Sequence, residues 1–302
     1  MMRSSAAVQE WSRIGKRTVM DRQLPQSAAT GPHPGGVMLA GNVDHDLSLV
    51  IPAHNEAQRL PATLAAALDI LDGWGLDYRI LVVDDGSTDG TPDIASQFGP
   101  RVSVARQINR GKGAAVRRGM LSASGRVVAF TDADLPYDLS ALRQAYQRIA
   151  AGEVQVVFGA RSLDASESTV PRRFLRGLAS TVFRRIRCCI LPGSVADTQC
   201  GLKAFSREAA HILFARAVVN GFAFDAEVVY LTQRLGISFA CQPVVLVNEE
   251  GSSVSLRRHA MPMLRDILAV QRRDRVDGYE VAAFVEARSR QWARQSQRAR
   301  AA

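Results

Sequence analysis

Short apolar runs rich in β-branched residues alternate along the chain with segments in which leucine recurs at helical spacing. The runs predict buried strands at residues 47–51, 78–83, 101–104, 126–130 and 154–158. Leucines spaced three or four apart over residues 60–71 predict a helix, and residues 139–149 repeat this spacing after Asp138, a suitable N-cap residue. Strands that alternate with helices predict an α/β fold with a mostly parallel central sheet and helices on both faces.

The same pattern divides the chain into three parts. Residues 1–45 are rich in Ser, Gly, Pro and Gln without an apolar period, so we expect a flexible leader. Residues 46–256 carry the alternating strands and helices and form the expected main domain, which includes a basic amphipathic segment at 170–192. Residues 257–302 predict an amphipathic and basic helical region that either reinforces a surface contact or frays. No stretch is long and apolar enough to predict a transmembrane helix.

Composition and charge narrow the class of protein. The chain has 302 residues and is 47% hydrophobic and 22% charged, which is typical of a globular protein. Its formal net charge of +9 favours an anionic partner without identifying it. The four cysteines show no C-x-x-C spacing, so we expect no structural zinc site. Without an apolar signal region at the N-terminus, we expect reduced thiols in the cytoplasm.

Two acidic clusters follow predicted strands. The segment 84–90, Asp-Asp-Gly-Ser-Thr-Asp-Gly, follows the second strand, and Asp132-Ala-Asp134 follows the fourth. Ligands of such sheets bind at the carboxyl ends of the strands, so we expect both clusters at one edge. An acidic turn can simply cap a helix. Two carboxylates at i and i+2 can instead hold Mg²⁺ or Mn²⁺ together with phosphate oxygens, and we predict that Asp132 and Asp134 do so.

A glycine-rich segment, Asn109-Arg-Gly-Lys-Gly113, precedes a helix that we expect to run to Leu121. It is not a Walker A loop, because Gly113 follows Lys112 where that motif has Ser or Thr. Two interpretations stay open. The segment is either a strand-to-helix turn or an anion site in which backbone N–H groups and Lys112 face a phosphate.

These motifs, in this order, resemble those of family 2 glycosyltransferases, which have the GT-A fold. The resemblance begins at Leu49-Val-Ile-Pro-Ala-His-Asn-Glu56 and continues through the acidic and glycine-rich segments. Two later segments, 197–203 (Asp-Thr-Gln-Cys-Gly-Leu-Lys) and 221–227 (Gly-Phe-Ala-Phe-Asp-Ala-Glu), resemble the branch that makes dolichyl- or polyprenyl-phosphate sugars, most closely the dolichyl-phosphate glucosyltransferases. The resemblance covers residues 47–270 and makes residues 46–256 the expected catalytic domain.

The resemblance implies an inverting, metal-dependent transfer of a hexose from a nucleoside diphosphate sugar to a polyprenyl phosphate. UDP-glucose is the expected donor, GDP-mannose the next, and Mg²⁺ or Mn²⁺ the expected cofactor. Mannosyl-transferring relatives carry a metal-assisting Gln where this chain has Pro136, which implies fewer protein ligands or a different donor. The residues expected to bind the donor are Pro52, Ala53, Glu56, Asp84, Asp85, Lys112 and Asp132.

The resemblance also implies further roles, and the catalytic residues that it suggests are Asp134, Asp225, Glu227 and Asp197. A sugar-hydroxyl acceptor would need a general base, for which Asp225 or Glu227 is expected. A phosphate acceptor is already largely dianionic at neutral pH and needs cations instead. The residues expected to bind the acceptor are Arg161, Gln199, Lys203 and Arg257. We expect Cys200 to be a small buried residue and His54 to be structural.

The segment 170–192 interleaves six arginines with apolar residues and contains no acid. This composition predicts either an interfacial helix on an anionic membrane or a core-facing helix with a basic side. We expect a cytoplasmic protein that associates peripherally with the inner face of the membrane. Two alternatives are a related transferase that acts on a sugar hydroxyl in polysaccharide or glycolipid synthesis, and a basic nucleic-acid-binding protein. No RNP-like motif or zinc finger is found, so we expect no nucleic-acid partner.

Overall fold

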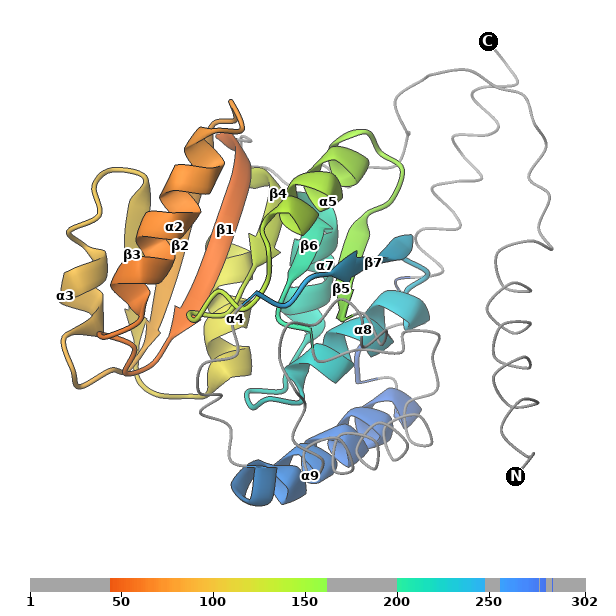
Figure 1. Ribbon diagram of the computed structural model, residues 1–302. Coiled ribbons are helices and arrows are strands. Elements are labelled where there is room, and N and C mark those ends of the chain that lie inside the picture. The colour runs from red at the N-terminus through yellow and green to blue at the C-terminus, as the bar shows by residue number, and fades with distance from the viewer. Residues whose placement is uncertain (1–43, 162–199, 248–255, 277, 281–283, 285–302) are drawn as a thin grey trace, which may run out of the picture. The chain divides into compact units, whose positions relative to one another are not determined.

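The computed structural model describes residues 44–161, 200–247, 256–276, 278–280 and 284. Nearly all of the expected leader, the basic segment 170–192, Asp197 and Gln199 lie outside the described residues. Figure 1 shows a central sheet with helices on both sides. The strands are β1 His45–Ala53, β2 Tyr78–Asp85, β3 Val102–Gln107, β4 Gly125–Phe130, β5 Val156–Arg161, β6 Lys203–Ser206 and β7 Phe239–Val244. The helices are α2 Leu60–Asp72, α3 Thr91–Ala95, α4 Lys112–Ser122, α5 Ser140–Ala150, α7 Arg207–Arg216, α8 Phe224–Arg234 and α9 Leu256–Arg275.

The sheet has the order β3-β2-β1-β4-β6-β5-β7. β1 pairs in parallel with β2 and β4, and β3 and β7 pair in parallel with β2 and β5. Only β6 runs antiparallel to its neighbours, β4 and β5. The predicted mostly parallel sheet is therefore confirmed, and β1 to β5 correspond to the five apolar runs.

The core lies on both faces of the sheet because side chains alternate along each strand. On β1, Leu47, Leu49 and Ile51 pack with α2, α3 and α5 in one cluster. Val50 points to the other face and packs in a second cluster with α4, α7, α8 and α9. The N-cap residue of α5 is Leu139 and not the predicted Asp138, which lies one residue earlier and accepts a hydrogen bond from the backbone N–H of Ser140 at 2.8 Å.

The C-terminal helix α9 is part of this core. Met263, Ile267 and Val270 are buried in the same cluster as α8, and Tyr230 on α8 donates a hydrogen bond from its hydroxyl to Asp274 at 2.7 Å. These three apolar side chains are thus covered by protein, and the expected surface contact of residues 257–302 stays a prediction. None of the helices within the described ranges is long and apolar enough to cross a bilayer.

Gly119 allows α4 to lie close against the sheet. A Cβ at this position would overlap Val50 Cγ1 of β1 and come within 3.0 Å of Val83 Cγ2 of β2. Because close-packed interiors accept added volume poorly, we expect Gly119→Ala to lower the free energy of unfolding by about 1–3 kcal/mol. Urea denaturation would measure the loss.

The control for this variant is Gly73→Ala. Gly73 has a φ of −70°, and the nearest contact of an added Cβ is the carbonyl oxygen of Ile70 at 3.4 Å. We expect a change within about 0.5 kcal/mol there. Equal losses in the two variants would show that the approach of α4 to β1 does not set the cost.

Candidate functional site

The carboxyl ends of β1, β2 and β4 bring most of the predicted site residues to one edge of the sheet. Pro52 and Ala53 are buried at the end of β1, and the strand register places Ala53 beside Asp84 of β2. Asp132 and Asp134 follow β4 in the same way. The start of α4 brings Lys112 to this edge, and α8 brings Asp225.

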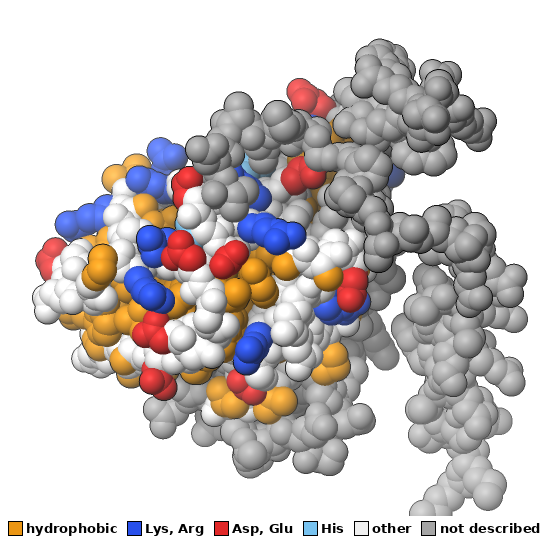
Figure 2. Space-filling model, turned by 90° about the horizontal axis from the view of Figure 1, so that it is seen from above, with side chains coloured by type: hydrophobic (Ala, Val, Ile, Leu, Met, Phe, Trp, Pro, Cys, Tyr) orange, Lys and Arg blue, Asp and Glu red, His pale blue; other side chains and the backbone are white. Residues whose placement is uncertain are grey.

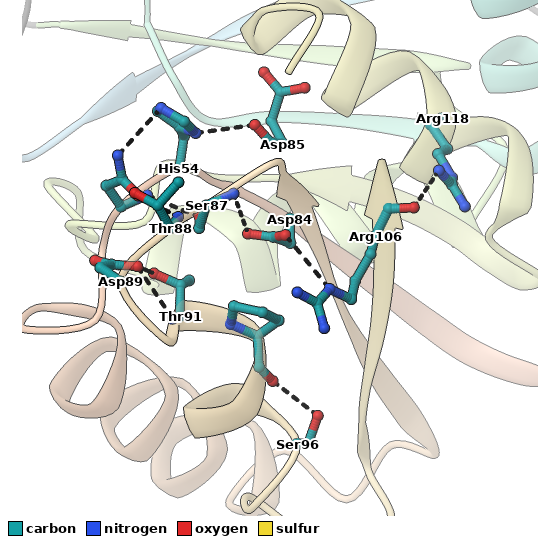
Figure 3. A network of polar contacts seen from close by, with 12 residues as sticks. His54, Asp84, Asp85, Ser87, Thr88, Asp89, Thr91, Ser96, Arg106 and Arg118 are labelled. Carbon is teal, nitrogen blue, oxygen red and sulfur yellow. Dashed lines mark hydrogen bonds and ion pairs between the residues drawn. The ribbon is translucent and has the colours of Figure 1, made fainter. Parts of the chain in front are cut away.

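The loop after β1 is tied to the loop after β2. The backbone N–H groups of Asn55 and Glu56 donate to the hydroxyl oxygens of Ser87 and Thr91, each at 2.9 Å. His54 Nδ1 lies 2.9 Å from the carbonyl oxygen of Asp85, as Figure 3 shows. These contacts fix the two loops relative to each other, and they agree with the structural role expected for His54.

Asp84 and Asp85 are almost completely buried, with exposed fractions of 1% and 4%. Asp85 accepts hydrogen bonds from the backbone N–H groups of Arg110 and Gly111, at 2.9 and 2.8 Å, and from Gln107 Nε2 at 2.7 Å. The anion held by the glycine-rich segment is therefore the Asp85 carboxylate. This favours a strand-to-helix turn over a phosphate cradle, because those N–H groups are already used. The Asp85 side chain therefore positions the loop, and its expected contact with the donor stays a prediction.

Two ion pairs form the centre of the site. Lys112 Nζ lies 2.5 Å from Asp132 Oδ1, and Lys203 Nζ lies 2.5 Å from Asp225 Oδ1. Burial lowers the pKa of Lys112, but the carboxylates of Asp132 and Asp225 more than offset this effect and raise the pKa overall. Lys112 is therefore charged at neutral pH and stands between two carboxylates. The charges alternate in the order Asp132, Lys112, Asp225, Lys203.

Lys203, which we expect to bind the acceptor, lies in a buried position. The residue is 1% exposed, and its ammonium also donates to the carbonyl oxygen of Cys200 at 2.5 Å. Its role toward the acceptor stays a prediction. Burial raises the pKa of Asp225, an effect that Lys203 and Lys112 oppose, so Lys203 acts as the counter-ion of Asp225. Cys200 is completely buried, as predicted.

Asp132 and Asp134 form a donor set that fits a divalent metal ion. Both are partly buried, and burial, followed by the like charge of Asp132, raises the pKa of Asp134. Gly201 lies directly against Asp132, because a Cβ there would overlap its carboxylate. Two crowded hard carboxylates suit Mg²⁺ or Mn²⁺, which complete their coordination with phosphate oxygens and water. Within the described ranges, no three His, Cys, Asp or Glu side chains group as metal ligands.

Glu56 extends this acidic group. It is partly buried and pairs with Arg59 at 3.1 Å. Burial raises its pKa, and although Arg59 opposes this shift, the charge of Asp134 adds to it. The charge of Asp134 therefore reaches the loop after β1, where the donor is expected to bind.

Glu227 is not part of the charged centre. It follows Asp225 by two residues on α8, and two helical residues turn by about 200°, so their side chains leave opposite sides of the helix. The fully buried Glu227 carboxylate accepts hydrogen bonds from the N–H groups of Val218 and Val219, at 3.0 and 2.9 Å, and from the Tyr279 hydroxyl at 2.7 Å. Burial raises the pKa of Glu227, and these hydrogen bonds oppose the rise. These contacts give Glu227 a structural role, and its predicted catalytic role stays untested.

Four predicted residues are not placed in the site by the structure. Asp197 and Gln199 lie outside the described residues, as do the side chains of Arg161 on β5 and Arg257 on α9. Conversely, Asn220 was not predicted. Its carbonyl accepts a hydrogen bond from the N–H of Ala114 at 3.3 Å, and its side chain accepts one from Arg117 Nη2 at 2.8 Å. A lone asparagine before the 221–227 segment gives no sequence signal for this contact.

Comparison with known proteins gives a consistent picture. The sequence model described as "Glycosyl transferase family 2" matches residues 48–214. The chain is 33% identical over 256 residues to dolichyl-phosphate beta-glucosyltransferase from Drosophila melanogaster, covering 79% of this chain and 78% of that protein. It is 32% identical to the protein of the same name from Homo sapiens, covering 75% of each. It is also 32% identical to the Dictyostelium discoideum protein of that name, covering 74% of this chain and 73% of that one.

Two solved structures share the fold. Mannosyl-3-phosphoglycerate synthase from Rubrobacter xylanophilus matches with a TM-score of 0.55 at 18% identity, over 78% of this chain and 75% of that one. Glucosyl-3-phosphoglycerate synthase from Mycobacterium tuberculosis, in complex with Mn²⁺, uridine-diphosphate-glucose and phosphoglyceric acid, matches with a TM-score of 0.53 at 22% identity, over 75% and 78%. These likenesses confirm the predicted GT-A fold.

The buried pair of Lys203 and Asp225 predicts strong coupling in stability. Lys203→Met leaves the Asp225 carboxylate buried without its counter-ion, and we expect the free energy of unfolding to fall by about 3–5 kcal/mol. The double variant Lys203→Met/Asp225→Asn removes both charges and should recover part of this loss. A double-mutant cycle measured by urea denaturation tests the coupling.

The matched control is the exposed pair of Arg79 and Asp77, whose side chains are 49% and 54% exposed at a separation of 3.2 Å. A cycle of Arg79→Met and Asp77→Asn should give a coupling below about 1 kcal/mol. Additive losses at Lys203 and Asp225 would contradict the assignment of these residues as a buried ion pair.

The contacts of Glu227 predict a purely structural effect. In Glu227→Gln the amide oxygen keeps the N–H groups of Val218 and Val219, but the NH₂ replaces the oxygen that accepts from the Tyr279 hydroxyl and the bonds lose their charge, so we expect the free energy of unfolding to fall by about 1–3 kcal/mol. Nucleotide binding, measured by calorimetry on the folded variant, should stay unchanged. Glu153→Gln is the control, because Glu153 is 57% exposed and pairs with Arg148 at the surface. If Glu227→Gln lost nucleotide binding while its stability stayed at the wild-type value, Glu227 would have a functional role in the site.

Proposed function

The chain belongs to glycosyl transferase family 2, and from this premise we propose that it transfers glucose from UDP-glucose to a polyprenyl phosphate of the dolichyl class. The relatives of this name, at 32–33% identity over about three quarters of the chain, support the substrate class. The observation that carries the proposal is the pair Asp132 and Asp134 after β4, with Lys112 against Asp132 at 2.5 Å. This arrangement suits the diphosphate of a nucleotide sugar.

The reaction is one in-line displacement. An oxygen of the acceptor phosphate attacks the anomeric carbon while the bond from that carbon to the β-phosphate oxygen of UDP breaks, so the configuration inverts and UDP leaves. The acceptor is largely dianionic at neutral pH, and no side chain has to remove a proton from it. Asp225 can therefore form an ion pair with Lys203, because the reaction needs no general base.

The residues of the site have separate tasks. Asp132 and Asp134 would hold a divalent cation, Mg²⁺ or Mn²⁺, which would supply positive charge next to the departing UDP. Lys112, kept charged by its carboxylate neighbours, adds a second positive group beside Asp132. Pro52, Ala53, Glu56 and Asp84 form the part of the edge assigned to the nucleoside. The residues that we assign to the acceptor and its surroundings are Arg161, Arg257, Asp197 and Gln199. We assign Asp225 to the placement of Lys112.

The acceptor places the protein at a membrane. A polyprenyl chain stays in the bilayer, so the enzyme works at the lipid surface, peripherally and on the cytoplasmic side where nucleotide sugars are present. A second candidate is the transfer of the same sugar to a sugar hydroxyl. The buried Asp225 favours it to the extent that burial raises the pKa of this carboxyl toward the range of a general base.

The experiment incubates the protein with labelled UDP-glucose or GDP-mannose, Mg²⁺ or Mn²⁺ and polyprenyl phosphate, and follows the label into the organic phase. We expect labelled lipid from UDP-glucose, loss of product with a chelator, and restoration by added metal. Asp134→Asn should lower the rate on the order of a hundredfold or more, because a metal ligand contributes several kcal/mol to the transition state.

Asp69→Asn is the matched control, since Asp69 is exposed on α2 away from this edge, and it should keep wild-type activity. If UDP-glucose binds but no lipid is labelled, the lipid acceptor is wrong and sugar hydroxyls become the acceptors to test. If Asp134→Asn is as active as Asp69→Asn, the metal assignment is wrong.

A further inference from the structure

A basic groove adjoins the candidate site on the outer side of α4. It has a volume of about 410 Å³ and lies between the end of β3, the glycine-rich segment and α4. Ile108, Arg110, Arg117, Arg118 and Leu121 are the lining residues that matter here, and the lining includes no Asp or Glu. We call this the arginine groove. Its three arginines belong to no step of the transfer reaction.

Neutral groups accept hydrogen bonds from two arginines of the groove, Arg117 and Arg118. Arg118 Nη1 donates to the carbonyl oxygen of Arg106 at 2.7 Å. Arg117 donates to the carbonyl oxygen of Ala217 at 3.2 Å and to the side-chain oxygen of Asn220 at 2.8 Å. Carbonyl and amide acceptors orient a guanidinium without cancelling its charge, and a fixed guanidinium suits a phosphate.

Other parts of the described surface differ from the groove. Some arginines there lie beside carboxylates, as in Arg79 with Asp77 at 3.2 Å and Arg101 with Asp72 at 2.8 Å. The face drawn in Figure 2 likewise has basic and acidic side chains interleaved. The arginine groove combines positive charge with the absence of acidic lining, so charge complementarity favours an anionic partner.

An exposed apolar side chain stands at the groove. Ile108 is 71% exposed, immediately after β3 and next to the glycine-rich segment. A large apolar group among arginines is the composition with which peripheral proteins enter the boundary between lipid headgroups and acyl chains. A nucleic-acid surface would explain the arginines but would gain little from an exposed isoleucine.

We propose that the arginine groove docks on an anionic lipid bilayer, with Ile108 entering the headgroup region and Arg110 and Arg118 contacting lipid phosphates. The inference deepens the proposed function, because a lipid acceptor requires the enzyme to meet the bilayer. Lys112 follows Arg110 by two residues, and Asp85 holds the backbone between them. Docking by this surface therefore brings the edge that carries Asp132 close to the lipid phosphates.

The test is sedimentation of the full chain with vesicles, without donor or acceptor. Phosphatidylcholine vesicles are compared with vesicles of phosphatidylcholine mixed with phosphatidylglycerol. We expect binding to the anionic vesicles, and at least a tenfold weaker affinity for Arg110→Glu/Arg118→Glu, since each basic residue near an anionic leaflet contributes about fivefold in affinity. Ile108→Ser should also weaken binding, whereas Val276→Ser, at a residue 79% exposed on the end of α9, should not.

The matched charge control is Arg79→Glu/Arg126→Glu. Arg126 is exposed and, like Arg118, donates to a backbone carbonyl oxygen, that of Ala150 at 2.8 Å. Equal binding by the two double variants, or equal losses in both, would overturn the proposal. Salt-dependent RNA binding that is lost in Arg110→Glu/Arg118→Glu, without vesicle binding, would assign the groove to nucleic acid instead.

Failure of docking is distinguishable from failure of the proposed function. Vesicle binding needs no catalysis, so Asp134→Asn should bind vesicles as the wild-type chain does. UDP binding, measured by calorimetry, should be equal in Arg110→Glu/Arg118→Glu and in the wild-type chain. A groove variant that loses UDP binding together with vesicle binding would show a disturbed site and contradict a separate docking surface.

Discussion

The crowding of carboxylates at one edge of the sheet is the constraint on which the site depends. Parallel strands end at the same edge, so the acids that follow β2 and β4 converge there, and α8 adds Asp225. Neighbouring carboxylates in a partly buried site remain ionised only if positively charged groups lie close to them. The chain has lysine only at positions 16, 112 and 203, and the last two meet this demand within the described site. A compact ammonium on a flexible stem fits these enclosed positions better than a planar guanidinium.

The charge of Asp85 is compensated by backbone N–H groups, and the conformation of two loops makes this possible. Gly86 and Gly111 have φ angles of +73° and +99°, which side chains other than glycine rarely adopt. Added Cβ atoms would come within 2.7 Å of the Asn109 nitrogen and 2.6 Å of the Asn220 carbonyl oxygen, respectively. The two glycines therefore let the loops approach closely enough for backbone N–H groups to neutralise Asp85. Backbone N–H groups thus compensate the charge of Asp85. Lys112 and Lys203 can therefore pair with Asp132 and Asp225.

Much of the fold could be predicted from the sequence, because β1 to β5 contain short apolar runs that alternate with segments of helical spacing. β6 could not, since it has four residues and begins with a lysine that is buried only through Asp225. β7 was also missed, because its burial alternates weakly and Pro243 interrupts it. For the site, position after a strand located Asp132 and Asp134. Nothing in the 221–227 segment tells which carboxylate faces the site, since Glu227 is turned away by contacts with residues 218, 219 and 279.

The balance of charge in the site affects how the anionic donor and acceptor can bind. Three carboxylates of the described centre, Asp132, Asp134 and Asp225, face two lysines, one of which is enclosed. Asp84 instead has the guanidinium of Arg106 at 3.9 Å. A nucleoside diphosphate adds further negative charge, so it is repelled until Asp132 and Asp134 are neutralised. Lys112 alone cannot do this, because Asp132 and Asp225 already share its charge. A divalent cation held by Asp132 and Asp134 would supply the missing positive charge for the donor. The acceptor phosphate would be a third anion, and it would need positive groups in addition to Lys112.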